Sequence, residues 1–120
     1  MATFTKSTLS GSTDGRPVKV VATATAGTVI HTGSTTATTI DEVWLYATNT
    51  SAADVKLTLE WGGVTSPDDL IEQTITTEAG LVLIAPGLLV KGNGTALIVR
   101  AFAASANVIT ISGYINQITA

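Results

Sequence analysis

The chain has 120 residues, a formal net charge of −3 and no cysteine. Hydrophobic residues make up 45% of it and charged residues 12%, which excludes a disordered chain, a disulfide framework and a thiolate metal site. The six Lys and Arg residues are scattered, and no apolar run reaches the roughly 18 residues of a membrane span. The composition therefore predicts neither a nucleic-acid nor a membrane partner.

Threonine and serine are unusually frequent, with 22 and eight residues. Threonine is β-branched and favours strands over helices. Freely exposed surfaces normally carry more charge than this chain offers, whereas self-associating surfaces are depleted in it. We therefore expect a β protein that associates with itself or docks on a partner. The first residues lack the apolar segment of a secretory signal, so we expect synthesis and assembly in a cytoplasm.

Residues 1–15 show no sustained hydrophobic period and are rich in Thr, Ser and Gly. This pattern predicts an extended N-terminal arm. Its only large apolar side chains are those of Phe4 and Leu9. Two interpretations stay open for them: they anchor the arm on a neighbouring subunit, or they tuck back onto the domain.

From residue 16 onward, short apolar stretches alternate with turn residues at intervals of roughly 8 to 12 residues, which is typical of an all-β sandwich. We expect residues 16–120 to form one antiparallel, jelly-roll-like β-sandwich domain. The expected strands are about 17–25, 27–32, 41–48, 54–61, 70–77, 80–85, 88–91, 95–103 and 107–117. Pro86-Gly87 is expected to break the run between two of them.

The clearest alternation lies in residues 54–61, where apolar and polar side chains occupy successive positions. Alternation of this kind predicts a strand with one buried face and one wet face. The apolar positions are Val55, Leu57, Leu59 and Trp61, and the polar positions are Lys56, Thr58 and Glu60.

The strand expected at 41–48 has no polar face in its middle, because Trp44 and Tyr46 lie opposite an apolar set. Such a strand is covered on both sides, so a loop, the arm or another subunit must cover these rings. In residues 95–103, around Arg100 and Phe102, apolar side chains again occupy both faces of the expected strand. The predicted interface residues are Phe4, Leu9, Trp44, Tyr46, Arg100 and Phe102.

Few residues suggest chemistry. His31 is the only histidine, which excludes a two-histidine metal site and leaves no identifiable triad, so we expect a surface or strand-edge histidine. The acids Asp68, Asp69 and Glu72 carry oxygens that Ca²⁺ prefers, but their spacing does not match a calcium loop, and a solvated turn at the start of one helical turn is the favoured interpretation.

The remaining acids raise one catalytic alternative. Asp41-Glu42 and Glu60 resemble the paired carboxylates of glycosidases only in residue type, and the expected environment of these acids is a solvated strand edge. We therefore expect no catalytic residue, no metal and no cofactor, and a protein that is not an enzyme.

Four sequence blocks carry a family resemblance. They are IDEVWLYATNT at 40–50, LTLEWGG at 57–63, SPDD at 66–69 and VITISGYIN at 108–116. Together they are similar to small virion proteins of tailed bacteriophages, over roughly residues 20–117. No catalytic motif accompanies this resemblance.

The resemblance implies a structural component of the virion, most like a head decoration (cement) protein. Such a protein is expected to assemble as a homotrimer, to contact the major capsid protein or another virion protein, and to lock neighbouring capsomers. A tail, neck or fibre accessory protein is the nearer alternative. The alternative from another class is a carbohydrate-binding or adhesive module, in which Trp44, Tyr46 or Trp61 would present a flat ring to a sugar.

Overall fold

Strands form the regular structure of the computed structural model, which describes residues 2–119. Over this range the chain contains nine strands and no helix. The strands are β1 (Thr3–Thr8), β2 (Val18–Lys19), β3 (Thr28–Thr32), β4 (Thr39–Asn49), β5 (Val55–Trp61), β6 (Leu70–Ile75), β7 (Val82–Lys91), β8 (Ile98–Ala103) and β9 (Ile109–Thr119). A membrane-spanning helix is accordingly not found among the described residues.

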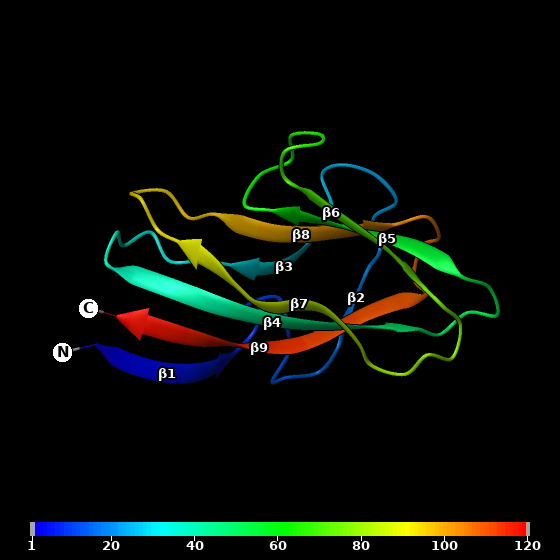
Figure 1. The fold of residues 1–120 in the computed structure, drawn as a ribbon, viewed down its shortest axis with the longest axis horizontal. Coiled ribbons are helices and arrows are strands. Elements are labelled where there is room, and N and C mark those ends of the chain that lie inside the picture. Colours follow the sequence, from blue (N-terminus) through cyan, green and yellow to red (C-terminus); the bar gives the residue numbers. More distant parts are fainter. Residues whose placement is uncertain (1, 120) are drawn as a thin grey trace.

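The strands build two antiparallel sheets that pack face to face (Figure 1). The first sheet has the order β1-β9-β4-β7, with β2 also paired to β9, and the second has the order β3-β8-β5-β6. The pairs β2–β9, β3–β8, β4–β7 and β5–β6 are nested around the middle of the chain. This nesting is the topology of a jelly roll, which confirms the predicted antiparallel β-sandwich.

The core lies between the sheets and follows the period of two. Along β4, every second side chain from Asp41 to Asn49 is buried and the side chains between them are half-buried. In β5, the predicted inner positions Val55, Leu57 and Leu59 are buried, and Trp61 packs against the same core. Burying a Leu or Val side chain fully stabilises the fold by about 1.5–3 kcal/mol.

The strand boundaries differ from expectation at two places. The strands expected at 80–85 and 88–91 are one strand, which begins at Val82, because β7 continues through Pro86-Gly87. Proline is tolerated there since β7 is an edge strand, and register shifts against β4 accommodate the bend. The strand expected at 17–25 is wrong for most of its length: only Val18 and Lys19 form β2.

The N-terminal segment contributes to the first sheet. β1 and β2 pair with successive parts of β9, and the residues between them cross to the second sheet, where the Gly11 N–H donates to the Ile30 carbonyl (3.0 Å). Leu9 is 1% exposed in the core, whereas Phe4 is 70% exposed. Of the two residues expected as anchors, Leu9 tucks back onto its own domain and Phe4 does not.

The outer side of the second sheet is covered by the loop between β2 and β3, which corrects the prediction of a wet face on β5. Thr58 and Glu60 are buried, and only Lys56 is exposed. The Glu60 carboxylate accepts the Gly27 N–H (2.7 Å) and the Thr25 hydroxyl. Both side-chain oxygens of Glu60 thus have hydrogen-bond partners, so the acid is tolerated away from water.

Candidate functional site

Four of the six aromatic residues lie on the outer face of the first sheet: Phe4, Trp44, Tyr46 and Tyr114. Strand register places them there, because directly opposite residues of antiparallel strands point to the same side. Trp44 is opposite Tyr114, and Phe4 is opposite Ile118, which pairs in turn with Ile40 of β4. The inward positions of β4 have odd numbers, so these partners face outward.

The centre of this face is a stack that crosses four strands. The Lys6 ammonium lies 4.9 Å from the centroid of the Tyr114 ring. Tyr114 stacks on Trp44, with 6.2 Å between centroids and 10° between planes. On the far side, Trp44 covers Gly87, where a Cβ atom would come within 3.1 Å of the indole. Each ring thus has a neighbour on both sides, and both side chains are half-buried.

Glu42 fixes the position of Trp44. Its Oε1 atom accepts the indole N–H of Trp44 (2.7 Å) and the amide N–H of Asn116 (3.0 Å). The hydrogen bond from Trp44, followed by that from Asn116, lowers the pKa of Glu42 below its ordinary value. Hydrogen bonds to a carboxylate favour its charged form, so Glu42 stays ionised and keeps holding the indole.

This arrangement predicts a pH dependence. A carboxylate whose pKa is lowered in the folded state stabilises the fold above its unfolded pKa, and this contribution is lost as pH falls through the folded pKa. The melting-temperature difference between wild type and Glu42→Gln should therefore be largest at neutral pH and shrink in acid. Thermal unfolding scans across pH measure it, and a difference that stays constant across pH would contradict the assignment.

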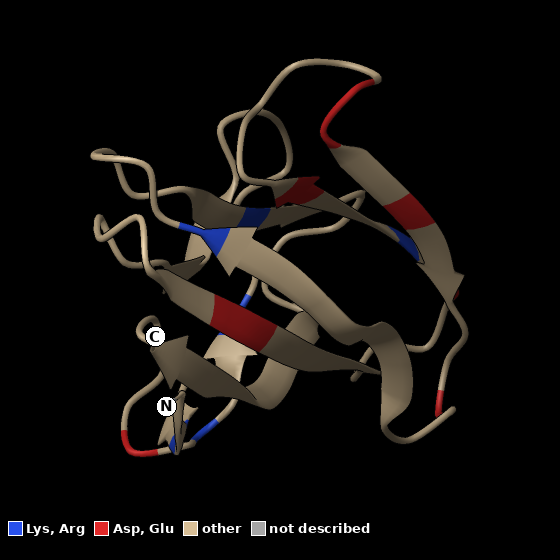
Figure 2. Ribbon diagram, turned by 60° about the vertical axis from the view of Figure 1, so that its left-hand side comes forward, with Lys and Arg blue, Asp and Glu red and all other residues tan. Residues whose placement is uncertain are grey.

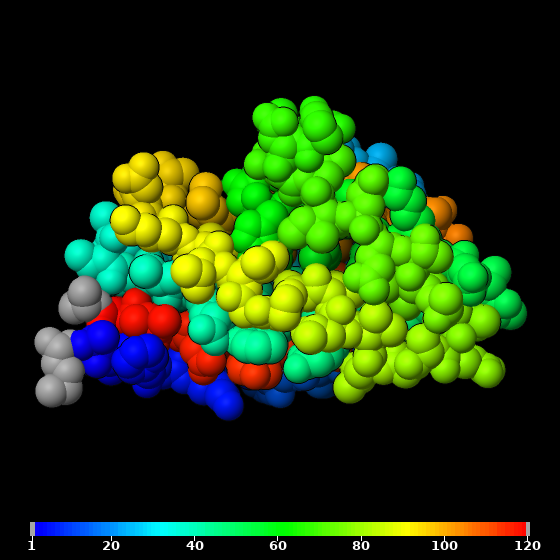
Figure 3. Space-filling view, viewed as in Figure 1, coloured from blue at the N-terminus to red at the C-terminus, as the bar shows by residue number. Residues whose placement is uncertain are grey.

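Exposed leucines widen the apolar surface around the stack. Leu83 of β7 is opposite Tyr46 and 44% exposed, and Leu89 is opposite Glu42 and 56% exposed. In Figure 3 the atoms of β7, in yellow-green and yellow, cross the visible side of the molecule. We call this surface the aromatic face. Its members are Phe4, Lys6, Glu42, Trp44, Tyr46, Leu83, Leu89, Tyr114 and Asn116.

Charge is sparse on the aromatic face. Lys6 and Glu42 are its charged members, and both are engaged, with Tyr114 and with Trp44 respectively. Two exposed lysines lie on the same side of the sheet beyond these members: Lys91, opposite Ile40, and Lys19, opposite Thr110. Figure 2 shows charged residues as few and scattered over the strands of the first sheet. An exposed apolar surface of this kind marks a site of interaction more often than an ordinary solvated face.

A second polar cluster is buried at the other side of the first sheet. His31 is 3% exposed and Asp41 is 2% exposed, with 2.7 Å between His31 Nε2 and Asp41 Oδ2. The Ser10 N–H donates to His31 Nδ1 (3.0 Å), so Nε2 carries the proton and donates to Asp41. Gln117 donates to the other Asp41 oxygen (3.1 Å). The cluster joins the segment after β1 to β3, β4 and β9.

This cluster corrects two predictions. His31 lies on the edge strand β3, as one of its two expected positions has it, but it is not at the surface. A register shift between Val29 and His31 lets the consecutive Ile30 and His31 both turn inward. Asp41 is not a solvated acid, because it sits in the same buried network. Both ring nitrogens and both carboxylate oxygens have partners within the fold. The arrangement serves to hold the segment after β1.

The predicted interface residues fall into three places. Phe4, Trp44 and Tyr46 lie on the aromatic face, with Phe4 in the row of Ile40, and Leu9 is in the core. Arg100 and Phe102 are half-buried on β8 of the second sheet, where they alternate with buried residues. Sequence reasoning missed Lys6, Leu83, Leu89 and Tyr114. The alternation of Ile109, Ile111 and Ile115 signalled that Tyr114 faces outward, but only the strand order shows which neighbours it meets.

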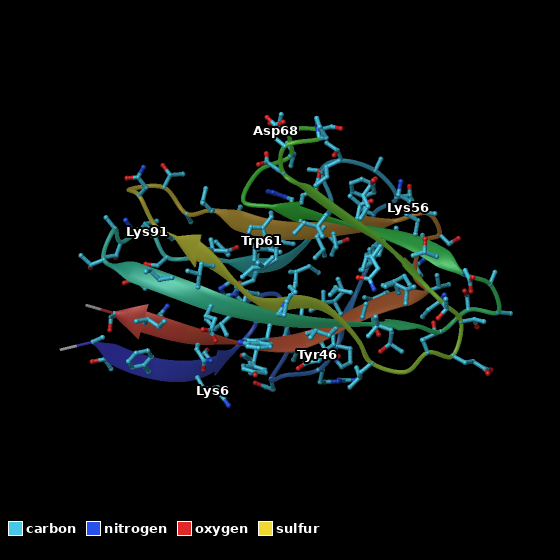
Figure 4. All side chains as sticks on the ribbon, viewed as in Figure 1. Lys6, Tyr46, Lys56, Trp61, Asp68 and Lys91 are labelled. Carbon is cyan, nitrogen blue, oxygen red and sulfur yellow. The ribbon has the colours of Figure 1, made fainter. Side chains whose placement is uncertain are left out.

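The acidic loop and the surface hollow offer no comparable site. Asp69 accepts the Thr65 N–H within its own turn (3.0 Å), and Glu72 pairs with Lys56 (2.8 Å) at the surface. At the expected helical turn, residues 66–69 form a turn in which the Asp69 N–H donates to the Thr65 carbonyl (2.9 Å), and this turn does not continue into a helix. Figure 4 shows Asp68 and Lys6 on opposite sides of the molecule. Within residues 2–119, no three potential metal ligands come together.

The hollow lies between the segment after β1 and the start of β2 and has a volume of about 280 Å³. Its lining residues are Gly11, Thr13, Arg16, Pro17, Val18 and Lys19. The two cations are both exposed side chains. The aromatic face is therefore the candidate functional site.

No family model, curated protein or solved structure matches this chain. The resemblance to phage virion proteins accordingly stays a prediction. The interpretation of function rests on the aromatic face and on the fold that presents it.

Proposed function

We propose that this protein is a non-enzymatic structural component of a tailed-phage virion, which decorates and stabilises the capsid by packing its aromatic face against another virion protein. The observation that carries the proposal is the aromatic face itself, with its exposed leucines and phenylalanine and its two engaged charges. Interface cores are enriched in aromatic residues and depleted in charge. The jelly-roll topology supports the same proposal, because capsid proteins use this architecture.

The aromatic face suits tight packing because its central side chains are already ordered. Tyr114 and Lys6 cover one side of Trp44, Gly87 lies on the other, and Glu42 holds the indole N–H. Ordering a mobile side chain at an interface costs roughly 0.5–1.5 kcal/mol of binding free energy. A stack that is rigid before binding avoids most of that loss.

The proposed place of action is the virion, with assembly in the host cytoplasm and the major capsid protein or another virion protein as partner. The homotrimer implied by the resemblance remains a prediction. A position at the tail, neck or fibre uses the same packing surface and is the alternative within this class.

The test replaces two exposed leucines of the aromatic face. We expect Leu83→Ser with Leu89→Ser to lower occupancy on phage particles that lack the protein by at least about tenfold, because interface residues in the packed centre carry most of the binding energy. Purified protein is added to these particles, and the bound fraction is measured by co-sedimentation. Melting temperature checks that the fold is intact.

The matched control is Leu97→Ser. Leu97 is 40% exposed, close to the 44% of Leu83, but it precedes β8 of the second sheet. This variant should bind like wild type. Equal binding by the Leu83/Leu89 variant, or no binding by wild type, would overturn the proposal.

The carbohydrate-binding alternative requires an aromatic ring whose face is open, because sugars stack on ring faces. Trp44 and Tyr114 cover each other's faces, and Lys6 and Gly87 cover the outer ones. Trp61 packs against the core and donates its indole N–H to the Leu89 carbonyl (3.2 Å), and Figure 4 shows it between the two sheets. For Trp44 and Trp61 the geometry therefore supports protein packing better than sugar binding, whereas for the half-buried Tyr46 the sugar alternative stays open.

A further inference from the structure

We propose that the free edge of β1 pairs with β1 of a second copy of this chain, antiparallel about a two-fold axis at Thr5. This pairing would join the two first sheets into one continuous sheet. It uses the free backbone edge of β1 and shares only Phe4 and Lys6 with the aromatic face, so it goes beyond the proposed function and is tested separately from it.

The first argument is the exposure of β1. Its six residues pair with β9 on one side, and within residues 2–119 no strand pairs with its other side. All six side chains are exposed, including the Phe4 ring. An edge strand presents a row of unpaired N–H and C=O groups to any extended segment that meets it. Figure 1 shows this edge lying free beside the N-terminus.

The second argument is that β2, which also ends the first sheet, has only two residues, and that the other three edges are protected while β1 is not. β7 carries Pro86 and register shifts. β3 is covered by the segment after β1, through bonds from Gly11 to Ile30 and from Thr32 to Ser10. These are devices by which proteins prevent edge pairing.

The last of the three, β6, carries the charged Glu72 in its middle. In contrast, β1 has an unbroken register with β9 and contains no proline, glycine or acid. Its one charge, on Lys6, is turned over the Tyr114 ring on the face of the sheet. Among the described edges, β1 is thus the one left open to a partner strand.

The third argument fixes the partner and the register. A two-fold axis perpendicular to the sheet places outward residues opposite outward residues, and these have even numbers in β1. Centring the pair on Lys6 sets two like charges directly opposite, which is destabilising. Centring it on Phe4 uses only three of the strand's six residues.

Centring the pair on Thr5 uses five residues of each strand. It places Phe4 of each copy opposite Lys6 of the other, so this contact forms twice. Because the Lys6 ammonium lies over Tyr114 of its own chain, the aliphatic stem of the lysine is the part that would pack beside the Phe4 ring. The strand is therefore self-complementary in one register, which identifies a second copy as its partner. Assemblies built this way have an even number of subunits, in place of the homotrimer that the resemblance implies.

Single cysteines test the register, because the chain has no cysteine of its own. Directly opposite Cβ atoms lie about 4.5–5.5 Å apart, near the separation of about 3.5–4.5 Å that a disulfide requires. Only position 5 faces itself in the proposed pair. Under mild oxidation, Thr5→Cys should therefore form linked dimers at least about tenfold faster than the matched controls Thr3→Cys and Ser7→Cys. Equal rates, or fastest linkage from Phe4→Cys or Lys6→Cys, would overturn the register.

Sedimentation across a concentration series tests the pairing without cysteines. Wild type should form dimers, and Phe4→Lys should weaken them by at least about tenfold, because it places two lysines opposite each other. Combining Phe4→Lys with Lys6→Phe restores the opposite pair and should recover dimers. The Leu83/Leu89 variant should dimerise like wild type, which separates this edge from the aromatic face. Monomers at all concentrations, or a trimer, would overturn the pairing.

Discussion

Gly113→Ala should lower the free energy of unfolding by at least about 3 kcal/mol, the upper range for forcing an extra methyl into packed structure. A Cβ atom on Gly113 would overlap the carbonyl oxygen of Trp44 and lie 3.2 Å from the Leu45 Cα. Both neighbours are backbone atoms of β4, which pairs with β9 along its whole length. Neither side chain rotation nor a small local shift relieves this overlap.

Chemical denaturation of wild type and variant measures the effect. Gly94→Ala is the matched control, because no heavy atom lies within 4 Å of a Cβ there. Its positive φ of 76° leaves a cost of about 1 kcal/mol for an L-residue. A loss below about 1 kcal/mol for Gly113→Ala would contradict the close approach of β9 to β4.

Asp41→Ala should destabilise the domain by about 2–6 kcal/mol, because it leaves two donors unsatisfied at about 1–3 kcal/mol each. The change leaves the Nε2–H of His31 and the amide of Gln117 without their acceptor oxygens in a buried site. The free energy of unfolding of a native protein is roughly 5–15 kcal/mol, so this one substitution removes a large share of the stability of the domain.

The comparison variant is Asp41→Asn, which keeps one acceptor oxygen for His31 and should lose less than Asp41→Ala. Hydrogen exchange adds a local readout. Because Ser10 donates to the same histidine, amides of the segment after β1 should lose protection in Asp41→Ala before the β4–β9 pairing does. Stability within about 1 kcal/mol of wild type for Asp41→Ala would contradict the buried network.

Local patterns predicted the inner faces of the strands well, because burial follows the period of two. Val55, Leu57 and Leu59 face the core as expected. The same pattern failed for Glu60, whose burial depends on a loop distant in sequence that supplies the Thr25 and Gly27 donors. That loop has no hydrophobic period, so its sequence does not indicate which part of the fold it covers.

Irregularities of strand geometry account for the other differences. His31 is buried because a bulge in β3 turns two consecutive side chains inward. Pro86-Gly87 does not end a strand, because β7 lies at the edge of its sheet. A proline there can turn the side without an N–H to solvent, so no hydrogen bond between strands is lost. Whether a strand is central or at the edge depends on sheet order, which the sequence pattern does not contain.

The sequence pattern identified some residues of the aromatic face and missed others, because it does not contain the sheet order. Trp44 and Tyr46 stood out because their strand lacks a polar face, and the structure places both on the aromatic face. Phe102 showed the same local signal but belongs to the second sheet. Tyr114 joins Trp44 only through the register of β9 with β4. Assigning strands to sheets therefore decides which aromatic residues act together.

A reconstruction of phage particles that carry this protein, at a resolution that separates strands, tests the proposed function most directly. We predict that the jelly roll sits on the particle with Leu83, Leu89 and the Trp44–Tyr114 stack buried against another virion protein. The second sheet should then face away from that contact. Particles without the protein, or a bound jelly roll whose aromatic face is turned to solvent, would contradict the proposal.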